Sequence, residues 1–118
     1  AQINVSKPYD NASYVSETIP DYTVYSAGQT FIKTWTLKND GNISWNENYT
    51  LAYYSENSFN AQPFNIPVAK EVKPGESYTF SVNLTAPDSS GYKRGYWRLK
   101  NPAVIWFGNK VWVIITVK

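Results

Sequence analysis

Four tryptophans, Trp35, Trp45, Trp97 and Trp112, occur in segments of the chain where strand-like residues predominate. Each indole ring can bury roughly 150–250 Å² of surface. The 118 residues include no cysteine, so neither a disulfide framework nor thiolate metal ligands can hold the fold together. We therefore expect these four rings to form the structural core.

The chain shows the two-residue alternation of β-strands and no helical period of three and four. Strand-like segments lie at residues 14–19, 23–25, 31–39, 45–53, 67–72, 77–86, 92–100 and 111–117. The first strand is interrupted by Pro20, which lacks a ladder donor and is expected at an edge or a bulge. About seven short strands, with turns between them, predict an all-β sandwich of antiparallel strands in two sheets.

Lys33 is the exception to the alternation in residues 31–39, because it falls on the apolar side with Phe31, Trp35 and Leu37. A lysine can bury its aliphatic stem while its ammonium group stays in water. We therefore expect Lys33 to lie near an end of its strand, with its charge solvated.

The length of the chain fits one domain. Residues 4–13 lack any pattern, so we place an N-terminal arm or linker at residues 1–12 and the domain at residues 13–118. No run approaches the 18 apolar residues of a membrane span, and no signal peptide is visible. We expect a monomeric domain that belongs to a larger protein.

Several classes of function are disfavoured by composition. The net charge of +2, without clustered Lys and Arg, does not predict nucleic-acid binding. The chain has neither His nor Cys to serve a nucleophile, and no motif ties two carboxylates together as glycoside hydrolysis requires. The turn at residues 39–42 lacks the spacing of a calcium loop. We expect no catalytic residues, no metal and no cofactor.

The strands and turns also carry, in order, a recurring set of residues. The set comprises residues 14–21, then Phe31, Trp35, Leu37, Asn39, Gly41, Trp45, Val72, Pro74, Gly75, Glu76, Leu84, Ala86, Pro87, Gly91, Trp97, Arg98, Leu99, Phe107, Gly108 and Trp112. With this set, residues 12–118 resemble the four-tryptophan (FW) domain. This is the immunoglobulin-like domain of the next-to-breast-cancer-one autophagy receptors and of bacterial surface proteins.

The resemblance implies an immunoglobulin-like β-sandwich that works as an interaction module and not as an enzyme. In the autophagy receptors the domain is implicated in binding cargo or partner proteins. In bacteria it often accompanies secreted or wall-associated proteins. The resemblance thus implies a non-catalytic accessory module of a secreted or cell-surface protein, with an extracellular or cell-surface location.

Five residues are candidates for partner binding. Tyr92, Arg94, Tyr96 and Arg98 alternate with core positions, so all four should point away from the core. Tyr and Arg are enriched at protein interfaces, although such a ladder can also serve only to stabilise the sheet. Trp106 lies between polar breaks, where its ring either covers the end of the sandwich or forms an exposed anchor for a partner.

Two functions remain open from the sequence. In the first, the domain binds a protein partner or acts as a spacer. In the second, it is a carbohydrate-binding module that holds a cell-surface polysaccharide by stacking sugars on exposed Tyr and Trp rings.

Overall fold

Eight β-strands form the regular structure of residues 7–118, the part of the chain that the computed structural model describes. They are β1 (Ala12–Glu17), β2 (Thr23–Tyr25), β3 (Thr30–Asn39), β4 (Thr50–Glu56), β5 (Asn65–Pro67), β6 (Ser77–Thr85), β7 (Gly91–Lys100) and β8 (Trp106–Val117). Within this range no residue is helical, so no helix of the described chain could span a membrane. The first half of the expected arm, residues 1–6, lies outside the described residues.

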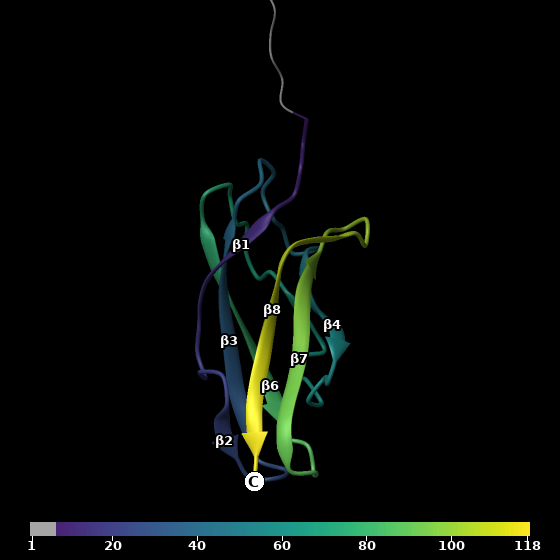
Figure 1. Cartoon of the computed structure of the whole chain (residues 1–118). Helices are drawn as coiled ribbons and strands as arrows, with labels where there is room; N and C mark the ends of the chain where they lie inside the picture. Colours follow the sequence, from purple (N-terminus) through teal and green to yellow (C-terminus); the bar gives the residue numbers. More distant parts are fainter. Residues whose placement is uncertain (1–6) are drawn as a thin grey trace, which may run out of the picture.

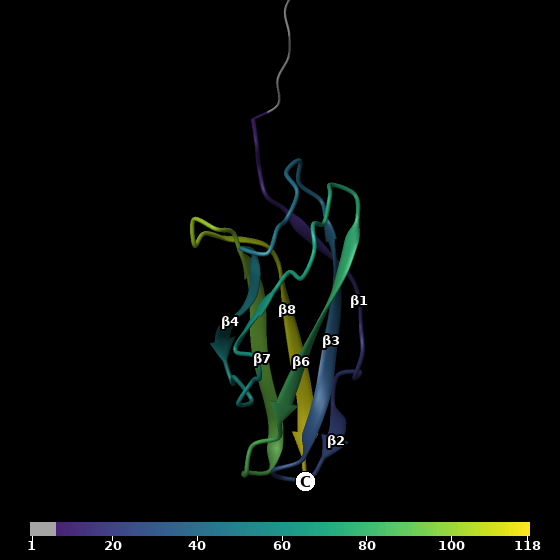
Figure 2. The same ribbon diagram turned by 180° about the vertical axis from the view of Figure 1, so that it is seen from behind.

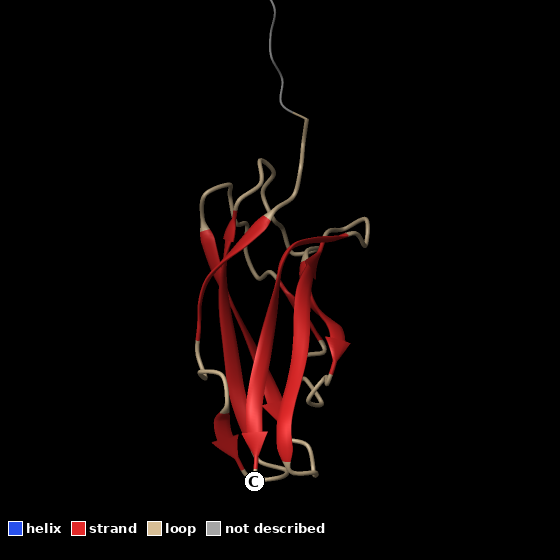
Figure 3. Cartoon of the chain, in the orientation of Figure 1, coloured by secondary structure: helices blue, strands red, loops and turns tan. Residues whose placement is uncertain are grey.

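The strands form two sheets that face each other (Figures 1 and 2). One sheet has the order β1-β3-β6 and the other has the order β2-β8-β7-β4-β5. The expected all-β sandwich is thus confirmed, and Figure 3 shows strands and loops only. One pairing differs from the expectation, because β2 runs parallel to β8 while the other pairs are antiparallel.

Alternation determines which side chains enter the space between the sheets. In β6, Phe80, Val82 and Leu84 are buried, while the Ser and Asn residues between them are exposed. In β3, the residues buried in the same way include Phe31, Trp35 and Leu37. These inward faces, together with those of β4, β7 and β8, form one continuous apolar core.

Three of the four tryptophans lie in that core. Trp35, Trp45 and Trp97 have no exposed surface, and the rings of Trp35 and Trp97 are 5.2 Å apart. The Trp35 indole N–H, from the three-stranded sheet, donates a hydrogen bond of 2.9 Å to the backbone carbonyl of Trp112 in the five-stranded sheet. This bond joins the two sheets directly through the core.

Trp112 does not lie in the core, so its expected role as a fourth core ring is wrong. On β8, Val111, Val113, Ile115 and Val117 point inward and are buried. Trp112 has the opposite parity, and its side chain is 39% exposed on the outer face of the sheet. Its backbone carbonyl still serves the core, because it accepts the Trp35 hydrogen bond.

The chain changes sheets between β1 and β2, and the Lys33 side chain lies beside the segment that crosses. β1 pairs with β3, whereas β2 pairs with β8 of the other sheet. The Lys33 ammonium group donates to the Glu17 carboxylate at 2.5 Å, to the Thr18 carbonyl and to the Ile19 carbonyl at 2.9 Å. It therefore supplies donors to carbonyls at the point where the first strand leaves its sheet.

The solvated ammonium expected for Lys33 is wrong, because the whole side chain is buried. Desolvation lowers the pKa of Lys33, and the Glu17 carboxylate opposes that shift. An ammonium group can be buried in this way only when charged and polar partners surround it.

Residues 7–11 lie against the domain without forming a strand. Asn42 exchanges hydrogen bonds with the backbone of Lys7 and Tyr9. A Cβ atom at Gly41 would lie 2.5 Å from the Tyr9 carbonyl oxygen, so only glycine permits this approach. β1 begins at Ala12, one residue before the expected start of the domain.

A second polar cluster joins this segment to the body of the domain. The Tyr49 hydroxyl donates to Asp10 at 2.7 Å, and the Asn101 amide donates to the other oxygen of the same carboxylate at 3.0 Å. Burial, followed by the hydrogen bond to Asp10, raises the pKa of Tyr49 far above its ordinary value.

Replacing the core tryptophans tests the division between core and surface rings. We expect Trp97→Ala to lower the free energy of unfolding by about 3–5 kcal/mol, because it leaves a large cavity. Trp112→Ala should cost about 1 kcal/mol or less, as surface substitutions do. Urea denaturation measures both, and equal losses would contradict the assignment of Trp112 to the surface.

Two substitutions separate the contribution of the hydrogen bonds from Lys33 to backbone carbonyls from that of its ion pair with Glu17. Lys33→Met removes the donor from two backbone carbonyls, and we expect it to cost about 3 kcal/mol. Glu17→Gln keeps an acceptor for the ammonium, so its cost should be smaller, about 1 kcal/mol. Lys38→Met, on the exposed face of β3, is the matched control. If Glu17→Gln proved the more damaging in denaturation experiments, the ion pair would matter more than the carbonyls.

The raised pKa of Tyr49 predicts a loss of stability at alkaline pH. The unfolded tyrosine ionises near pH ~10, whereas the folded one keeps its proton to higher pH. The contribution of protonated Tyr49 to the free energy of unfolding is therefore fully present below pH ~10. Above that pH it falls, by up to about 1.4 kcal/mol per pH unit. Chemical denaturation between pH ~9 and ~11 should show a shallower decline for Tyr49→Phe than for the wild type. Equal declines would contradict this.

Candidate functional site

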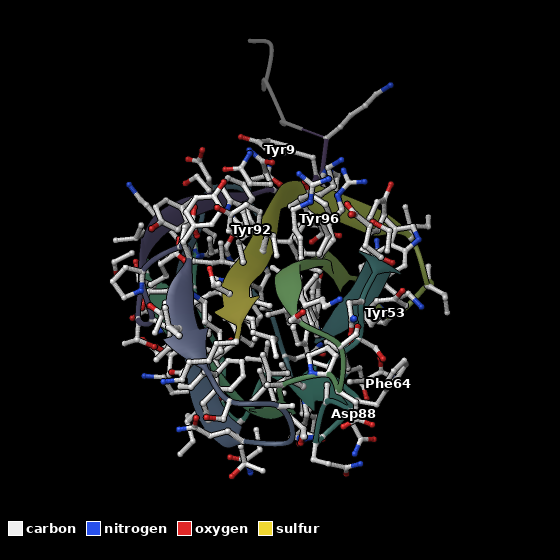
Figure 4. The ribbon with its side chains drawn as sticks, turned by 60° about the horizontal axis from the view of Figure 1, so that its bottom comes forward. Tyr9, Tyr53, Phe64, Asp88, Tyr92 and Tyr96 are labelled. Atoms are coloured by element: carbon white, nitrogen blue, oxygen red, sulfur yellow. The ribbon has the colours of Figure 1, made fainter. Side chains whose placement is uncertain are left out.

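The outer face of the five-stranded sheet brings together most of the candidate binding residues. On β7, Gly95, Trp97 and Leu99 are buried, so the intervening side chains point outward. The structure places all four candidates of this strand, Tyr92, Arg94, Tyr96 and Arg98, on that outer side. Figure 4 shows Tyr92 and Tyr96 along the same side of the ribbon.

Neighbouring strands add further aromatic and basic side chains to this surface. β8 contributes Trp106, Lys110 and Trp112, while β4 contributes Tyr54 and Glu56. We call this surface the aromatic-basic face and define it by Tyr54, Glu56, Tyr92, Arg94, Tyr96, Arg98, Lys100, Trp106, Lys110 and Trp112.

One end of the aromatic-basic face is held by an ion pair and ring contacts. Arg94 forms a salt bridge of 3.1 Å with Glu56, and its guanidinium carbon lies 5.2 Å from the centre of the Tyr96 ring. The hydrogen bond to Glu56 raises the pKa of Arg94. Tyr92, which is 74% exposed, meets Tyr22 edge to face at 5.2 Å.

At the other end, cations rest on rings. Tyr54 and Trp106 meet edge to face at 4.9 Å. The Lys100 ammonium lies 4.5 Å from the Trp106 ring centre, and Arg98 and Lys110 lie 5.8 Å and 5.5 Å from the Tyr54 ring centre. Among the described residues, none of these three cations forms a salt bridge.

Trp106 therefore fits neither of the two alternatives that the sequence left open. It begins β8 and pairs with Lys100 of β7, so it belongs to the sheet and not to the connecting loop. Its side chain is half-buried against Tyr54 and Lys100. The ring lies on the aromatic-basic face as part of a cluster.

A groove of about 460 Å³ opens beside Trp112, between β8 and β1. Its floor includes Trp112, Tyr96 and Lys110, and its wall is Tyr14 and Glu17 of β1. The Tyr14 hydroxyl donates to Glu17 at 3.0 Å, and burial together with this bond raises the pKa of Tyr14. Because Glu17 is already paired with Lys33, the charge in the groove without a salt-bridge partner is that of Lys110.

Charge is unevenly divided over the molecule. The aromatic-basic face carries four basic side chains, Arg94, Arg98, Lys100 and Lys110, and one carboxylate, Glu56. Its net charge of about +3 exceeds the +2 of the whole chain, so the remaining surface is slightly acidic. Asp21 borders the face, where it accepts a 3.4 Å hydrogen bond from the Trp112 indole.

Sequence reasoning missed five members of this surface, which are Tyr54, Glu56, Lys100, Lys110 and Trp112. For Trp112 a signal was present, because Thr116, the polar residue of the predicted strand at residues 111–117, shares parity with Trp112 and not with the buried valines. For Tyr54 alternation also gave a signal, because Tyr54 has the parity opposite to Leu51 and Tyr53, which pair with the buried Leu99 and Trp97. A bulge between Tyr53 and Ser55 interrupts the alternation there, and bulges depend on pairing that a single strand does not reveal.

Among residues 7–118 the face gathers no set of metal-ligating side chains. No group of three or more His, Cys, Asp or Glu residues within 7–118 could hold a metal ion. Its chemistry consists of large rings, cations on those rings and one ion pair, which are the groups that bind other molecules non-covalently.

Sequence comparison places the fold in a family. Residues 18–117 match the family described as "Ig-like domain from next to BRCA1 gene". The chain belongs to this family. Its description names an immunoglobulin-like domain and no reaction, and the resemblance to the domain of the next-to-BRCA1 proteins is thereby confirmed. The relatives reported below include no bacterial surface protein.

The similar proteins are much longer than this chain. The Next to BRCA1 gene 1 protein of Mus musculus is 33% identical over 114 residues, which cover 93% of this chain and 11% of that protein. Protein ILRUN of Danio rerio is 30% identical over 75% of this chain and 30% of its own length. The Arabidopsis thaliana NBR1 homolog is 27% identical over 99% of this chain and 17% of its own. The chain thus corresponds to one segment of such proteins.

These relatives correct one expectation. The extracellular or cell-surface location is wrong, because the matching Next to BRCA1 gene 1 proteins of mouse and human and the Arabidopsis homolog are not extracellular proteins. The location was implied by the bacterial branch of the resemblance and by a composition low in charged residues, which is also common in secreted β-rich domains.

Solved structures agree with the fold. The CARDB domain of a Pyrococcus furiosus protein aligns with a TM-score of 0.58 at 13% identity and covers 96% of this chain and 97% of its own. A Caenorhabditis elegans MSP family member aligns with a TM-score of 0.52 at 11% identity, over 90% of this chain and 99% of its own. Such low identities establish the shared fold only.

Proposed function

We propose that this chain is a non-catalytic protein-binding module, and that it binds its partner through the aromatic-basic face. The observation that carries the proposal is the placement of Trp112, which is 39% exposed on the face, against Tyr96 and beside the groove. Exposed Trp, Tyr and Arg are the residues that most often dominate the energy of protein interfaces.

The rigidity of the face supports the same function. Its side chains come from paired strands, and ring contacts and an ion pair hold them in place. Rigid groups lose little conformational entropy when a partner binds. The next-to-BRCA1 relatives contain the domain as a small part of a long chain, which suits a module that recruits another protein.

The carbohydrate alternative is less well supported. A sugar stacks on the open face of an aromatic ring. Here cations already lie over several rings, namely those of Tyr54, Tyr96 and Trp106. None of the relatives described above is named for a carbohydrate ligand either.

Two further features belong to the proposal. We place the folded module from Ala12, where β1 begins, to residue 118, and residues 7–11 lie hydrogen-bonded against it. We also propose that it acts as a monomeric domain of a larger protein, since a face of like charge disfavours pairing with itself.

A random peptide library tests the proposed face. Binders should be selected on the wild-type chain and then measured against Trp112→Ala by fluorescence anisotropy. We expect most selected peptides to lose about tenfold or more in affinity, as hot-spot residues do when truncated.

Ile32→Ala is the matched control for this experiment, because Ile32 is an exposed apolar residue on the opposite sheet. Peptides should bind this variant as they bind the wild type. If no peptides were selected, or if both variants bound them equally, the face would not be the binding site and the spacer role would stand.

A further inference from the structure

We infer that the partner of the aromatic-basic face is an acidic, extended segment of another protein. This inference rests on the proposed function and adds the chemistry of the partner. It concerns the end of the face formed by Tyr54, Arg98, Lys100, Trp106 and Lys110, which we call the cationic cluster.

The first step is the balance of charge. The cationic cluster contains three basic side chains and no carboxylate, and none of the three forms a salt bridge among the described residues. Arg94, at the other end of the face, is instead paired with Glu56. The unpaired cations therefore attract negative charge from a partner, and this attraction also steers its approach.

The second step is the position of the cations. Lys100 lies over Trp106, while Arg98 and Lys110 lie over Tyr54. A ring orients a cation without neutralising it, because the ring carries a quadrupole and no net charge. The Arg98 Nε atom also donates to the Gly108 carbonyl at 2.9 Å, which fixes the guanidinium group while its terminal nitrogens stay available. The cluster is thus arranged in advance for carboxylates.

The third step is spacing. Arg98 and Lys100 are two residues apart on β7, so their side chains leave the sheet about 7 Å apart. Side chains on one side of an extended peptide repeat at the same interval. Acidic residues at every second position would therefore meet successive cations, while the side chains between them point away from the sheet.

A second copy of this chain is not the occupant that these observations favour. Two aromatic-basic faces would bring together two surfaces that each carry about +3, and like charges in contact oppose association. Elsewhere in residues 7–118 no three carboxylates gather closely enough to hold a metal ion, so the rest of the described surface offers no dense acidic patch to match this face.

Two peptides of about ten residues, roughly 33 Å when extended, test the inference. Glu and Tyr alternate in the first, and Lys and Tyr alternate in the second. In fluorescence anisotropy at low salt we expect the Glu peptide to bind at least tenfold more tightly than the Lys peptide. Its affinity should fall steeply at about 1 M salt, where screening is nearly complete.

Charge reversal locates the site. The double substitution Lys100→Glu and Lys110→Glu should weaken the Glu peptide by about tenfold or more. The control is Lys38→Glu with Lys73→Glu, which changes the net charge equally at exposed positions outside the face. Thermal melting of both variants verifies that they are folded.

The outcomes separate the inference from the function on which it rests. Equal binding of the two peptides, no binding of either, or equal effects of the two double substitutions would each overturn the acidic partner. The proposed function would still stand if library peptides without acidic residues bound in a manner that depends on Trp112. If no peptide depended on Trp112, the function itself would fail.

Discussion

The hydrogen bond from the Trp35 indole to the Trp112 carbonyl is the interaction on which the rest of the molecule depends. It crosses the core from β3 to β8 and spans 2.9 Å between its heavy atoms. Because Trp35 also lies against Trp97 of β7, one side chain contacts β7 and β8, two adjacent inner strands of the larger sheet. The opposite faces of those strands carry Tyr96 and Trp112. The core therefore determines where the exposed rings stand, and the binding surface is as rigid as the sandwich behind it.

The buried polar groups of the core differ in whether they have hydrogen-bond partners. Trp35 has a carbonyl partner, but the indole nitrogens of Trp45 and Trp97 have none among residues 7–118 although both rings are fully buried. A buried donor without an acceptor costs free energy, which the large apolar area of each ring must outweigh. Lys33 shows the opposite arrangement, since its buried ammonium has three acceptors. Polar groups in this core are thus best satisfied at the point where the first strand changes sheets, which is where free carbonyls would otherwise remain.

The sequence predicted the architecture well because alternation is a local property. The two faces of β6 and β7 follow from parity alone, and Pro20 marks the interruption between β1 and β2 that the structure contains. The errors arise where an outcome depends on partners that are distant in the chain. Lys33 is buried because the segment after Glu17 crosses to the other sheet and brings the Thr18 and Ile19 carbonyls beside the ammonium group. Alternation along one strand does not predict this contact. Trp112 was assigned to the core on the strength of its size and the family pattern, although its strand neighbours indicated the other face.

The neighbours of Trp112 on the aromatic-basic face explain how a large apolar ring can be partly exposed to water. Exposed rings are a liability for solubility unless polar groups accompany them. Here Lys110 lies between the rings of Tyr54 and Tyr96 at 5.5 Å and 5.4 Å, and Tyr96 in turn contacts Trp112. A charge thus stands between the two rings, and under the proposed function it keeps this apolar surface soluble until a partner binds. A chain that needed only a spacer would gain nothing from this arrangement, because an ordinary polar sheet face would be equally soluble and less prone to unwanted association.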